Sequence, residues 1–285
     1  MDNTRVLALL DGSDYSHSVC HHTAWIAQKL GAGVDAMHVL GRREGVEKTN
    51  LSGNLALGAR TTLLTELASL DEQRAKLAQA KGHAILEDAK AILEQDGAAG
   101  VKLHLRKGDL LEAVQTLESG ARIITIGQRG EAHGFADGHL GSNLERIIRA
   151  SKAPVFVAPR VYKPIFKVLV AYDGSASAMT AITRMAGSPV FTDLALTVLC
   201  VGQDAGKAQA TAEQAVAELQ SANVAATSRT TIGEPEKMLN DLVTTEGFDL
   251  LVMGSYGHSR IRNLVIGSTT TAMIQAAGIP VLLYR

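Results

Sequence analysis

The sequence predicts an α/β protein made of two tandem doubly wound domains, each with a five-stranded parallel sheet flanked by helices. Two observations lead to this prediction. One pattern of segments occurs twice along the 285 residues. Within each copy, short apolar segments of strand length alternate with longer segments of helical periodicity. Such alternation is typical of parallel βαβ units joined by right-handed crossovers.

The repeat rests on three pairs of matching segments, namely Val6–Ser13 with Val168–Ser175, Ile123–Gly130 with Leu250–Gly257, and Ala153–Val157 with Ile279–Leu283. Between the copies, Pro159 and Pro164 interrupt regular structure. We therefore place the first domain at residues 1–160 and the second at residues 165–285. The first copy also carries an insertion near residues 41–80, which the second copy lacks.

In the first copy, the apolar segments expected to form strands are Arg5–Leu10, Val34–Leu40, Val101–Arg106, Arg122–Gly127 and Pro154–Ala158. Helical periodicity predicts helices over Ser13–Leu30, over Thr61–Gln95 with a weak point at Gly82, from Asp109 onward, and from Gly141-Ser142 onward. The glycine-rich, polar segment Gly41–Arg60 follows the second strand at its carboxyl end. We expect it to be a mobile loop close to the ligand site of the first copy.

The second copy is more compact. Its expected strands are Phe166–Tyr172, Leu194–Val201, Val224–Thr231, Leu250–Gly254 and Pro280–Tyr284. Its expected helices are Ser177–Ala186, Ala205–Ala222, Pro235–Glu246 and Ser268–Ala277. Each copy thus ends in an apolar strand that would leave an exposed sheet edge. We expect the copies to pair through these last strands as a pseudo-dimer within one chain, and we leave a homodimer of whole chains open.

Composition limits the classes of partner. With 46% hydrophobic and 20% charged residues, the chain can bury a substantial core. Its net charge of −1 gives no electrostatic case for nucleic acid or an anionic membrane as the main partner. No apolar run reaches the ~18 residues that span a bilayer. The N-terminus also lacks the basic and apolar segments of a signal peptide. We expect a cytoplasmic protein.

The two cysteines of the chain and the histidines near Cys20 suggest structural roles. Cys20 and Cys200 are not arranged as a CxxC pair, so we expect buried free thiols. His17, Cys20, His21 and His22 are metal-binding residue types, but no further ligand can be named. His22 falls on the inner face of the predicted helix, where a hydrogen-bonded core histidine is commoner. We therefore predict no metal site on protein side chains.

A glycine-rich segment near the C-terminus has the features of a phosphate-binding loop. The apolar run that ends at Met253 continues into the spacing Gly254-x2-Gly257-x9-Gly267-Ser268, followed by Thr269. Glycines let a backbone turn sharply and approach a ligand closely. The start of a helix at Gly267-Ser268 offers free N–H groups and a positive dipole end. The alternative is that the glycines only form a turn.

A second segment strengthens the phosphate-site hypothesis. The strand ending at Tyr172 is followed by Asp173-Gly174-Ser175, a turn that can also cap a helix. Taken together, these two segments resemble the universal stress protein family in its nucleotide-binding branch. The resemblance covers nearly the whole chain as a tandem protein, and it implies the Rossmann-like fold of that family. It also implies that ATP binds at these two loops, with Mg²⁺ on the phosphates.

The resemblance assigns residues to this second-domain site. It implies that the nucleotide is bound by Ala171, Tyr172, Asp173, Val201, Met253, Gly254, Gly257, His258, Gly267, Ser268 and Thr269. Asp173 would accept hydrogen bonds from ribose hydroxyls, and Val201 would contact adenine through its main chain. His258 lies within the phosphate loop, but the simpler interpretation for it is an exposed loop residue. No catalytic residue is predicted.

The first copy departs from the pattern. A possible second site would consist of Leu9, Leu10, Asp11, Val39, Gly127, Gly130, Gly141 and Ser142. Ten residues separate Gly130 from Gly141, one more than in the second copy. Glu131 and Asp137 in this loop would oppose a triphosphate unless a metal intervenes. We therefore expect the second-domain site to dominate.

Two functions of different classes follow from these features. The first is ATP binding in nucleotide-dependent stress response or signalling, with at most slow hydrolysis. The second is a nucleotide-independent module that senses another ligand or binds a protein through the inserted segment. A true ATPase or phosphotransferase fits less well, because no phosphate lysine and base pair is evident.

Overall fold

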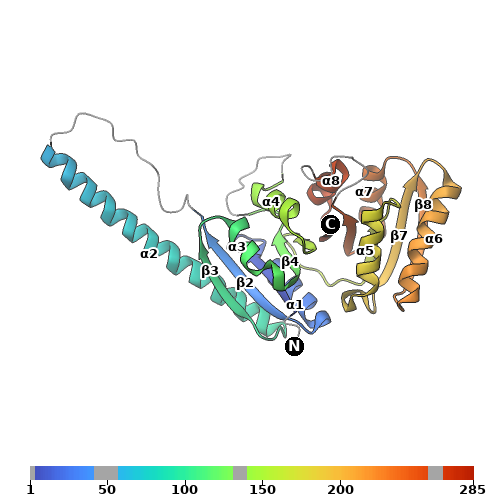
Figure 1. Ribbon diagram of the computed structural model, residues 1–285, viewed down its shortest axis with the longest axis horizontal. Coiled ribbons are helices and arrows are strands. Elements are labelled where there is room, and N and C mark those ends of the chain that lie inside the picture. The colour runs from blue at the N-terminus through green and yellow to red at the C-terminus, as the bar shows by residue number, and fades with distance from the viewer. Residues whose placement is uncertain (1–3, 42–56, 131–139, 256–265) are drawn as a thin grey trace.

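A computed structural model describes residues 4–41, 57–130, 140–255 and 266–285, with only the backbone of 57–63 and of residue 177 (Figure 1). The strands of the first domain are β1 (Arg5–Leu10), β2 (Gly33–Leu40), β3 (Lys102–Lys107), β4 (Ala121–Gly127) and β5 (Val155–Ala158). Its helices are α1 (Ser16–Leu30), α2 (Leu57–Gln95), α3 (Leu110–Leu117), the 3-10 turn η2 (Glu118–Gly120) and α4 (Ser142–Ala150).

The second domain repeats this order. Its strands are β6 (Lys167–Ala171), β7 (Ala195–Gly202), β8 (Ala226–Ile232), β9 (Leu250–Gly254) and β10 (Val281–Tyr284). Its helices are α5 (Ala176–Ala186), the 3-10 turn η3 (Pro189–Phe191), α6 (Ala205–Ser221), α7 (Pro235–Glu246) and α8 (Ser268–Ala276). The η3 turn was not predicted, and β8 begins at Ala226 rather than at Val224.

Local sequence explains where several helices begin. Asp109 caps α3 by accepting from the backbone N–H groups of Leu111 and Glu112. Ser175 caps α5 by accepting from Ala178 N–H, so the predicted Asp-Gly-Ser cap is supplied by the serine. Pro235 occupies the first position of α7, where a missing N–H costs no intrahelical bond.

The two domains share one continuous sheet. The ten strands follow the order β3-β2-β1-β4-β5-β10-β9-β6-β7-β8. Within each domain the five strands are parallel, whereas β5 and β10 pair antiparallel with Phe156 opposite Leu282. The pairing of the copies through their last strands is therefore confirmed. Each strand covers the edge that the other would expose.

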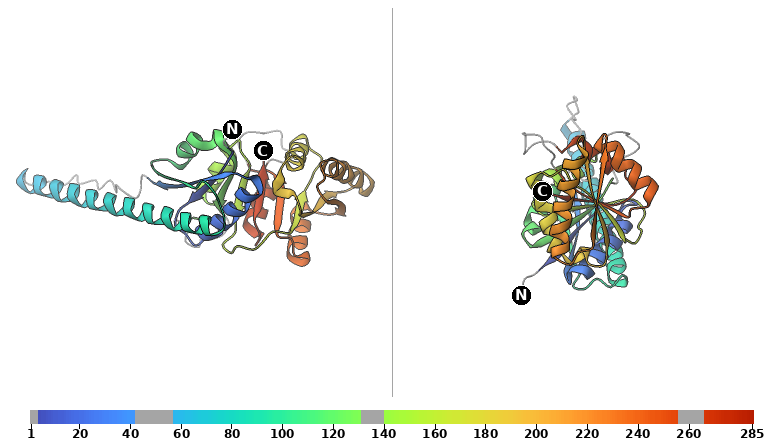
Figure 2. Two further views of the ribbon diagram at one scale, coloured as in Figure 1. Left: turned by 90° about the horizontal axis from the view of Figure 1, so that it is seen from below. Right: turned by 90° about the vertical axis from the view of Figure 1, so that its right-hand side faces the viewer.

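Helices cover both faces of this sheet (Figures 1 and 2). Residues of α1, α2, α5 and α6 pack in one apolar core, and residues of α3, α4, α7 and α8 pack in the other. The strands supply both cores because successive side chains point to opposite faces: Val6 and Ala8 belong to the first core, and Leu7 and Leu9 to the second. The predicted doubly wound α/β architecture is confirmed.

The inserted helix differs from its prediction. α2 runs without interruption from Leu57 to Gln95, so the predicted weak point at Gly82 is wrong. Gly82 lies where α2 packs against the sheet: a Cβ there would stand 2.7 Å from Leu105 Cδ1 and 3.1 Å from His38 Cδ2. The glycine permits close packing, and the tertiary contacts outweigh its low helix propensity. Within the predicted Gly41–Arg60 loop, residues 57–60 are helical and residues 42–56 lie outside the described part of the chain.

Candidate functional site

The predicted site residues lie at the carboxyl ends of neighbouring parallel strands. In each domain the chain order reverses between the first and fourth strands, which are β1 and β4 in one domain and β6 and β9 in the other. This is the switch point where open α/β sheets bind ligands. The loops after these strands and the start of the following helix therefore face a common space.

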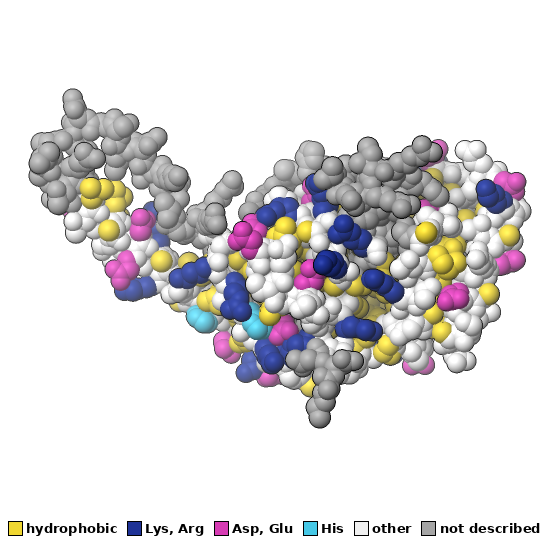
Figure 3. Space-filling model, in the orientation of Figure 1, with side chains coloured by type: hydrophobic (Ala, Val, Ile, Leu, Met, Phe, Trp, Pro, Cys, Tyr) yellow, Lys and Arg dark blue, Asp and Glu magenta, His cyan; other side chains and the backbone are white. Residues whose placement is uncertain are grey.

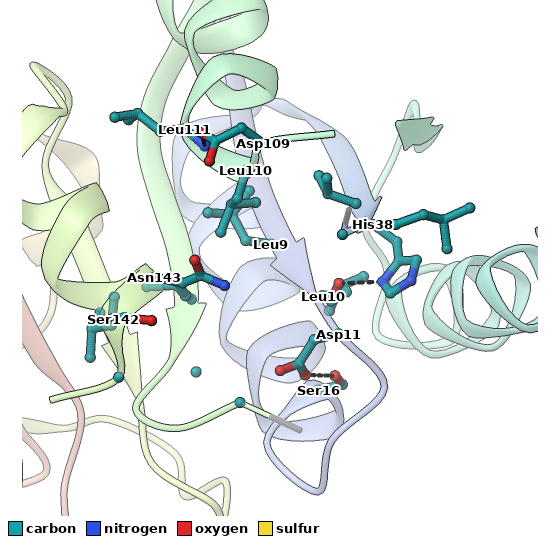
Figure 4. A pocket seen from close by; sticks show the side chains of 18 of the residues that line it. Leu9, Leu10, Asp11, Ser16, His38, Asp109, Leu110, Leu111, Ser142 and Asn143 are labelled. Carbon is teal, nitrogen blue, oxygen red and sulfur yellow. Dashed lines mark hydrogen bonds between the residues drawn. The ribbon is translucent and has the colours of Figure 1, made fainter. Parts of the chain in front are cut away.

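The first domain has a pocket of about 1290 Å³ at this point. All eight residues predicted for the first-domain site line it: Leu9, Leu10, Asp11, Val39, Gly127, Gly130, Gly141 and Ser142. In Figure 4, Ser142 and Asn143 of α4 lie across the pocket from Asp11 and His38. The sheet topology thus brings together residues up to 133 positions apart (Leu9 to Ser142).

Asp11 is positioned by its own turn. Its Oδ1 accepts a hydrogen bond from Ser13 N–H at 3.0 Å and one from Ser16 Oγ at 3.3 Å. A Cβ at Gly130 would lie 2.6 Å from the other carboxylate oxygen, Oδ2. Any other residue at this position would displace the Asp11 carboxylate, so the glycine lets the loop after β4 approach Asp11 in this position. This contact joins the two halves of the predicted first-domain site.

An ion pair that was not predicted from the sequence lines the pocket. Arg146 of α4 forks onto Asp109, with Nη1–Oδ2 at 2.8 Å and Nη2–Oδ1 at 2.9 Å. The guanidinium lowers the pKa of the Asp109 carboxyl below its ordinary value, aided by the α3 amides that it caps. A capping role for Asp109 could be read from the sequence, but the fork could not, because its partner lies 37 residues away.

The inserted helix contributes a further wall that the prediction did not include. Arg74, Leu77, Ala78 and Lys81 of α2 line the first-domain pocket. They recur at helical spacing and so share one side of the helix. The sequence placed this insertion near the first ligand site but gave no signal for which of its residues face the pocket. Only the packing of α2 against β2 and β3 determines them.

The second-domain site is described in part. Asp173 is exposed, and its Oδ1 accepts from Ser175 N–H at 2.9 Å, as expected of a turn residue. At the end of β9, Thr270 Oγ1 donates to Gly254 O at 3.3 Å, and Gly267 N–H donates to Ser255 O at 3.4 Å. These bonds hold the start of α8 beside the end of β9. Gly257 and His258 lie outside the described residues.

Within the described part of the chain, the start of α8 has no side-chain cap. Its N-cap residue is Gly267, followed by Ser268 and Thr269 in the first turn. A glycine has no side chain with which to satisfy the first N–H groups of the helix. The same arrangement occurs in the first domain, where Gly141 precedes α4. Both helices can therefore present backbone donors and a positive dipole end to an anion.

Other predicted second-domain residues contribute backbone rather than side chain. The Tyr172 side chain is buried against Met179, and its N–H donates to Leu199 O at 2.9 Å; the prediction for Tyr172 concerned its backbone and not its phenol. The Met253 side chain is buried as well. Ala171 and Val201 are half-buried at the ends of β6 and β7. The position of Ala171 and Val201 at strand ends could be predicted from the sequence. The burial of the Tyr172 side chain could not.

The histidine and cysteine cluster of α1 does not converge on one point. His21 Nδ1 pairs with Asp96 Oδ2 at 2.5 Å, while His22 is fully buried and donates from Nδ1 to Ser18 O at 2.8 Å. Cys20 and Cys200 are buried free thiols, as predicted. Within the described ranges no group of three or more His, Cys, Asp or Glu side chains could hold a metal ion.

Comparison with known proteins identifies the family. The sequence model of the Universal stress protein family matches residues 3–159 and 164–285. The chain belongs to this family. A universal stress protein of Synechocystis sp. is 39% identical over 284 residues, which are 98% of this chain and 99% of that relative.

Solved structures share the fold. A universal stress protein from Archaeoglobus fulgidus superposes with a TM-score of 0.73 at 19% identity, over 99% of this chain and 98% of its own. A Pseudomonas aeruginosa protein of unknown function gives 0.62 at 13% identity, over 98% and 91%. At these identities the likeness concerns the fold alone. This tandem universal stress protein has no helix, among the residues described, that is long and apolar enough to cross a membrane.

Proposed function

We propose that this tandem universal stress protein binds ATP in its second domain and acts in nucleotide-dependent stress response or signalling. One observation supports the proposal above all. The loop that contains Asp173, the end of β9 at Gly254 and the uncapped start of α8 at Gly267 surround the switch point between β6 and β9. An anion at this point would meet backbone N–H groups and a helix dipole, and the Asp173 carboxylate could accept from ribose hydroxyls.

Magnesium would enter this site through the nucleotide. The described loops offer backbone amides, hydroxyls and one aspartate, which suit a phosphate chain better than a bare divalent cation. Mg²⁺ normally keeps several waters and is held largely by phosphate oxygens. The described residues also include no base and lysine pair at the start of α8, so we propose at most slow hydrolysis.

A nucleotide-independent function is the second candidate, and α2 is the observation that favours it. The helix gives the first-domain pocket the apolar side chain of Leu77 and the cations Arg74 and Lys81. An apolar surface beside positive charge would suit a larger anionic metabolite. In this alternative the first domain senses that ligand, and the second domain needs no nucleotide.

The purified full-length chain can distinguish the two candidates. We expect nucleotide carried through purification to be identified by mass, and calorimetric titration with MgATP to give one dominant binding event. Asp173→Ala should weaken MgATP binding at least tenfold, by the loss of one or two hydrogen bonds at roughly 1.5–3 kcal/mol each. Asp241→Ala on the exposed surface of α7 is the matched control and should leave binding unchanged.

Two results would contradict the proposal. The first is no MgATP binding at millimolar nucleotide by a chain whose fold is intact. The second is an equal loss of affinity in the Asp173 and Asp241 variants. Multiple-turnover release of ADP at several turnovers per second would instead point to a true ATPase.

A further inference from the structure

The two halves of the inserted helix α2 differ in burial. In its second half, Leu86, Ala89 and Leu93 are fully or almost fully buried against the first domain. Between residues 64 and 81 no side chain is buried. Figures 1 and 2 show this part of α2 leaving the body of the molecule. An isolated helix is only marginally stable in water. A packing partner would therefore stabilise the projecting part of α2.

The projecting part carries an apolar stripe. Leu64, Leu70 and Leu77 are 55%, 49% and 72% exposed, which are high values for leucine. Leu70 and Leu77 are seven residues apart and therefore lie on one side of the helix, two turns from each other. Figure 3 shows hydrophobic side chains gathered near the free end of α2, with charged groups beside them. This stripe, defined by Leu70 and Leu77, is the candidate docking surface.

The order of the charged residues along the projecting part indicates a second copy of the same helix as the partner of the stripe. The acidic residues of the projecting part, Glu66, Asp71 and Glu72, precede its basic residues, Arg74, Lys76 and Lys81. Two copies of this helix side by side in the same direction would place like charges next to each other. In the opposite direction, the acidic half of each copy would face the basic half of the other. Antiparallel pairing is also the favourable alignment of two helix dipoles.

One antiparallel register satisfies both the stripe and the charges. When Leu70 of one copy faces Leu77 of the second copy, Glu66 of the first faces Lys81 of the second. The two-fold symmetry of such a pair repeats each contact, giving two leucine contacts and two ion pairs. A lipid surface would not suit the stripe, because the acidic residues beside it would be repelled by anionic headgroups.

We propose that the projecting part of α2 is a homodimerisation surface, through which two chains pair by their α2 helices in antiparallel orientation. This pairing is independent of the proposed nucleotide binding in the second domain, and two of its residues, Leu77 and Lys81, also line the first-domain pocket. It differs from the β5–β10 pairing, which joins the two domains of one chain. The last strands would thus join the two domains within one chain, and the inserted helix would join two chains.

Sedimentation equilibrium of the full-length chain tests the proposal. We expect a dimer at micromolar concentrations. Leu70→Glu combined with Leu77→Glu should give a monomer with unchanged thermal unfolding of the domains, since both side chains are exposed. The matched control is Ala68→Glu with Ala75→Glu, which adds the same charge with the same spacing at exposed positions on the other side of the helix. This control should remain dimeric.

Charge exchange tests the antiparallel register. Glu66→Lys alone and Lys81→Glu alone should each weaken the dimer at least about tenfold, because each places two pairs of like charges together. The double variant should restore the affinity of the native chain. A strictly monomeric native chain at 100 μM would overturn the proposal. So would a dimer that survives the leucine double variant, or a charge exchange that restores nothing.

Discussion

Single residues distinguish the two candidate sites. In the first domain, the Asp11 carboxylate lies so close to Gly130 that a side chain at position 130 would displace it. In the second domain, Asp173 is exposed and bonds its own turn. Gly141 before α4 and Gly267 before α8, in contrast, occupy the same position. Each is the N-cap residue of its helix and has no side chain to cap it. Selective substitution at these two glycines can therefore compare the sites directly.

Gly267→Val should abolish most ATP binding, because a β-branched side chain would block the approach of phosphate to the start of α8. Gly141→Val, at the equivalent position of the first domain, should leave tight binding nearly intact. The loop of the first domain has one extra residue and two carboxylates, which oppose a triphosphate. Isothermal titration of both variants measures the difference. Equal losses, or a larger loss from Gly141→Val, would refute the predicted asymmetry.

His22 should make stability depend on pH. Burial lowers the pKa of His22 to about 4, and its Nε2 has no hydrogen-bond partner among the residues that the structure describes. The unfolded chain takes up a proton below about pH 6.5, whereas the folded chain resists it until about pH 4. The stability from neutral His22 is therefore present above pH 6.5 and lost as the pH falls towards 4. The loss between pH 7 and pH 5 should be about 2 kcal/mol.

Denaturant unfolding of His22→Leu at several pH values checks this dependence. The variant removes the ionisable ring while keeping an apolar side chain beside Phe156 and Tyr162. Its stability should fall less between pH 7 and pH 5 than that of the native chain. The same loss in both proteins would mean that other groups cause the acid sensitivity.

At the scale of elements, one helix, α2, contributes both to the core of the first domain and to the wall of its pocket. Its second half packs on β2 and β3 through small and apolar residues, and its middle lines the first-domain pocket. Its counterpart in the second domain, α6, has 17 residues against 39. The insertion thus changes the shape of one ligand pocket without disturbing the repeated strand order.

Gly82→Val should destabilise the first domain by roughly 1–3 kcal/mol, because the added atoms have no room against Leu105 and His38. His38 Nδ1 donates to Leu10 O at 2.7 Å beside the pocket, so ligand binding there should weaken too. Ala84→Val is the control: it has the same β-branched side chain in the same helix at an exposed position, and should cost less than 1 kcal/mol. Equal losses in denaturant unfolding would show that Gly82 has no packing role.

At the scale of the whole molecule, the tandem chain behaves as a covalently linked dimer of domains. The β5–β10 pairing extends both sheets into one. Side-chain bonds add to it: Gln128, which lines the first-domain pocket, donates to Ile274 O at the end of α8, and Arg285 donates to Arg149 O at 3.0 Å. These contacts reinforce the strand pairing that joins the two domains, and one of them lies beside the first-domain pocket.

A chain truncated after Tyr162 should aggregate or form a homodimer, because removal of β10 exposes the backbone of β5 and apolar side chains such as Phe156. Light scattering coupled to gel filtration measures this, with the full-length chain as reference. A soluble, strictly monomeric first half with the stability it has in the full chain would contradict the prediction.

The sequence by itself determined the features that depend on local pattern and on repetition. Apolar periodicity predicted the strands and helices within a few residues, and the repeat predicted two parallel units. The apolar last strands, 154–158 and 280–284, predicted how the units join. The strand-end residues Asp11, Gly130, Gly141 and Ser142 were predictable as neighbours, because parallel strands carry their following loops to one edge.

Only the tertiary structure decided features that depend on packing between distant segments. Gly82 reads as a helix breaker in sequence, yet contacts with Leu105 and His38 make it a packing site. The burial of Tyr172, the fork of Arg146 on Asp109 and the contribution of α2 to the pocket have no local signature. Local pattern fixes which face of an element is apolar. Which partner that face meets, and at what distance, is set by the docking of whole helices on the sheet.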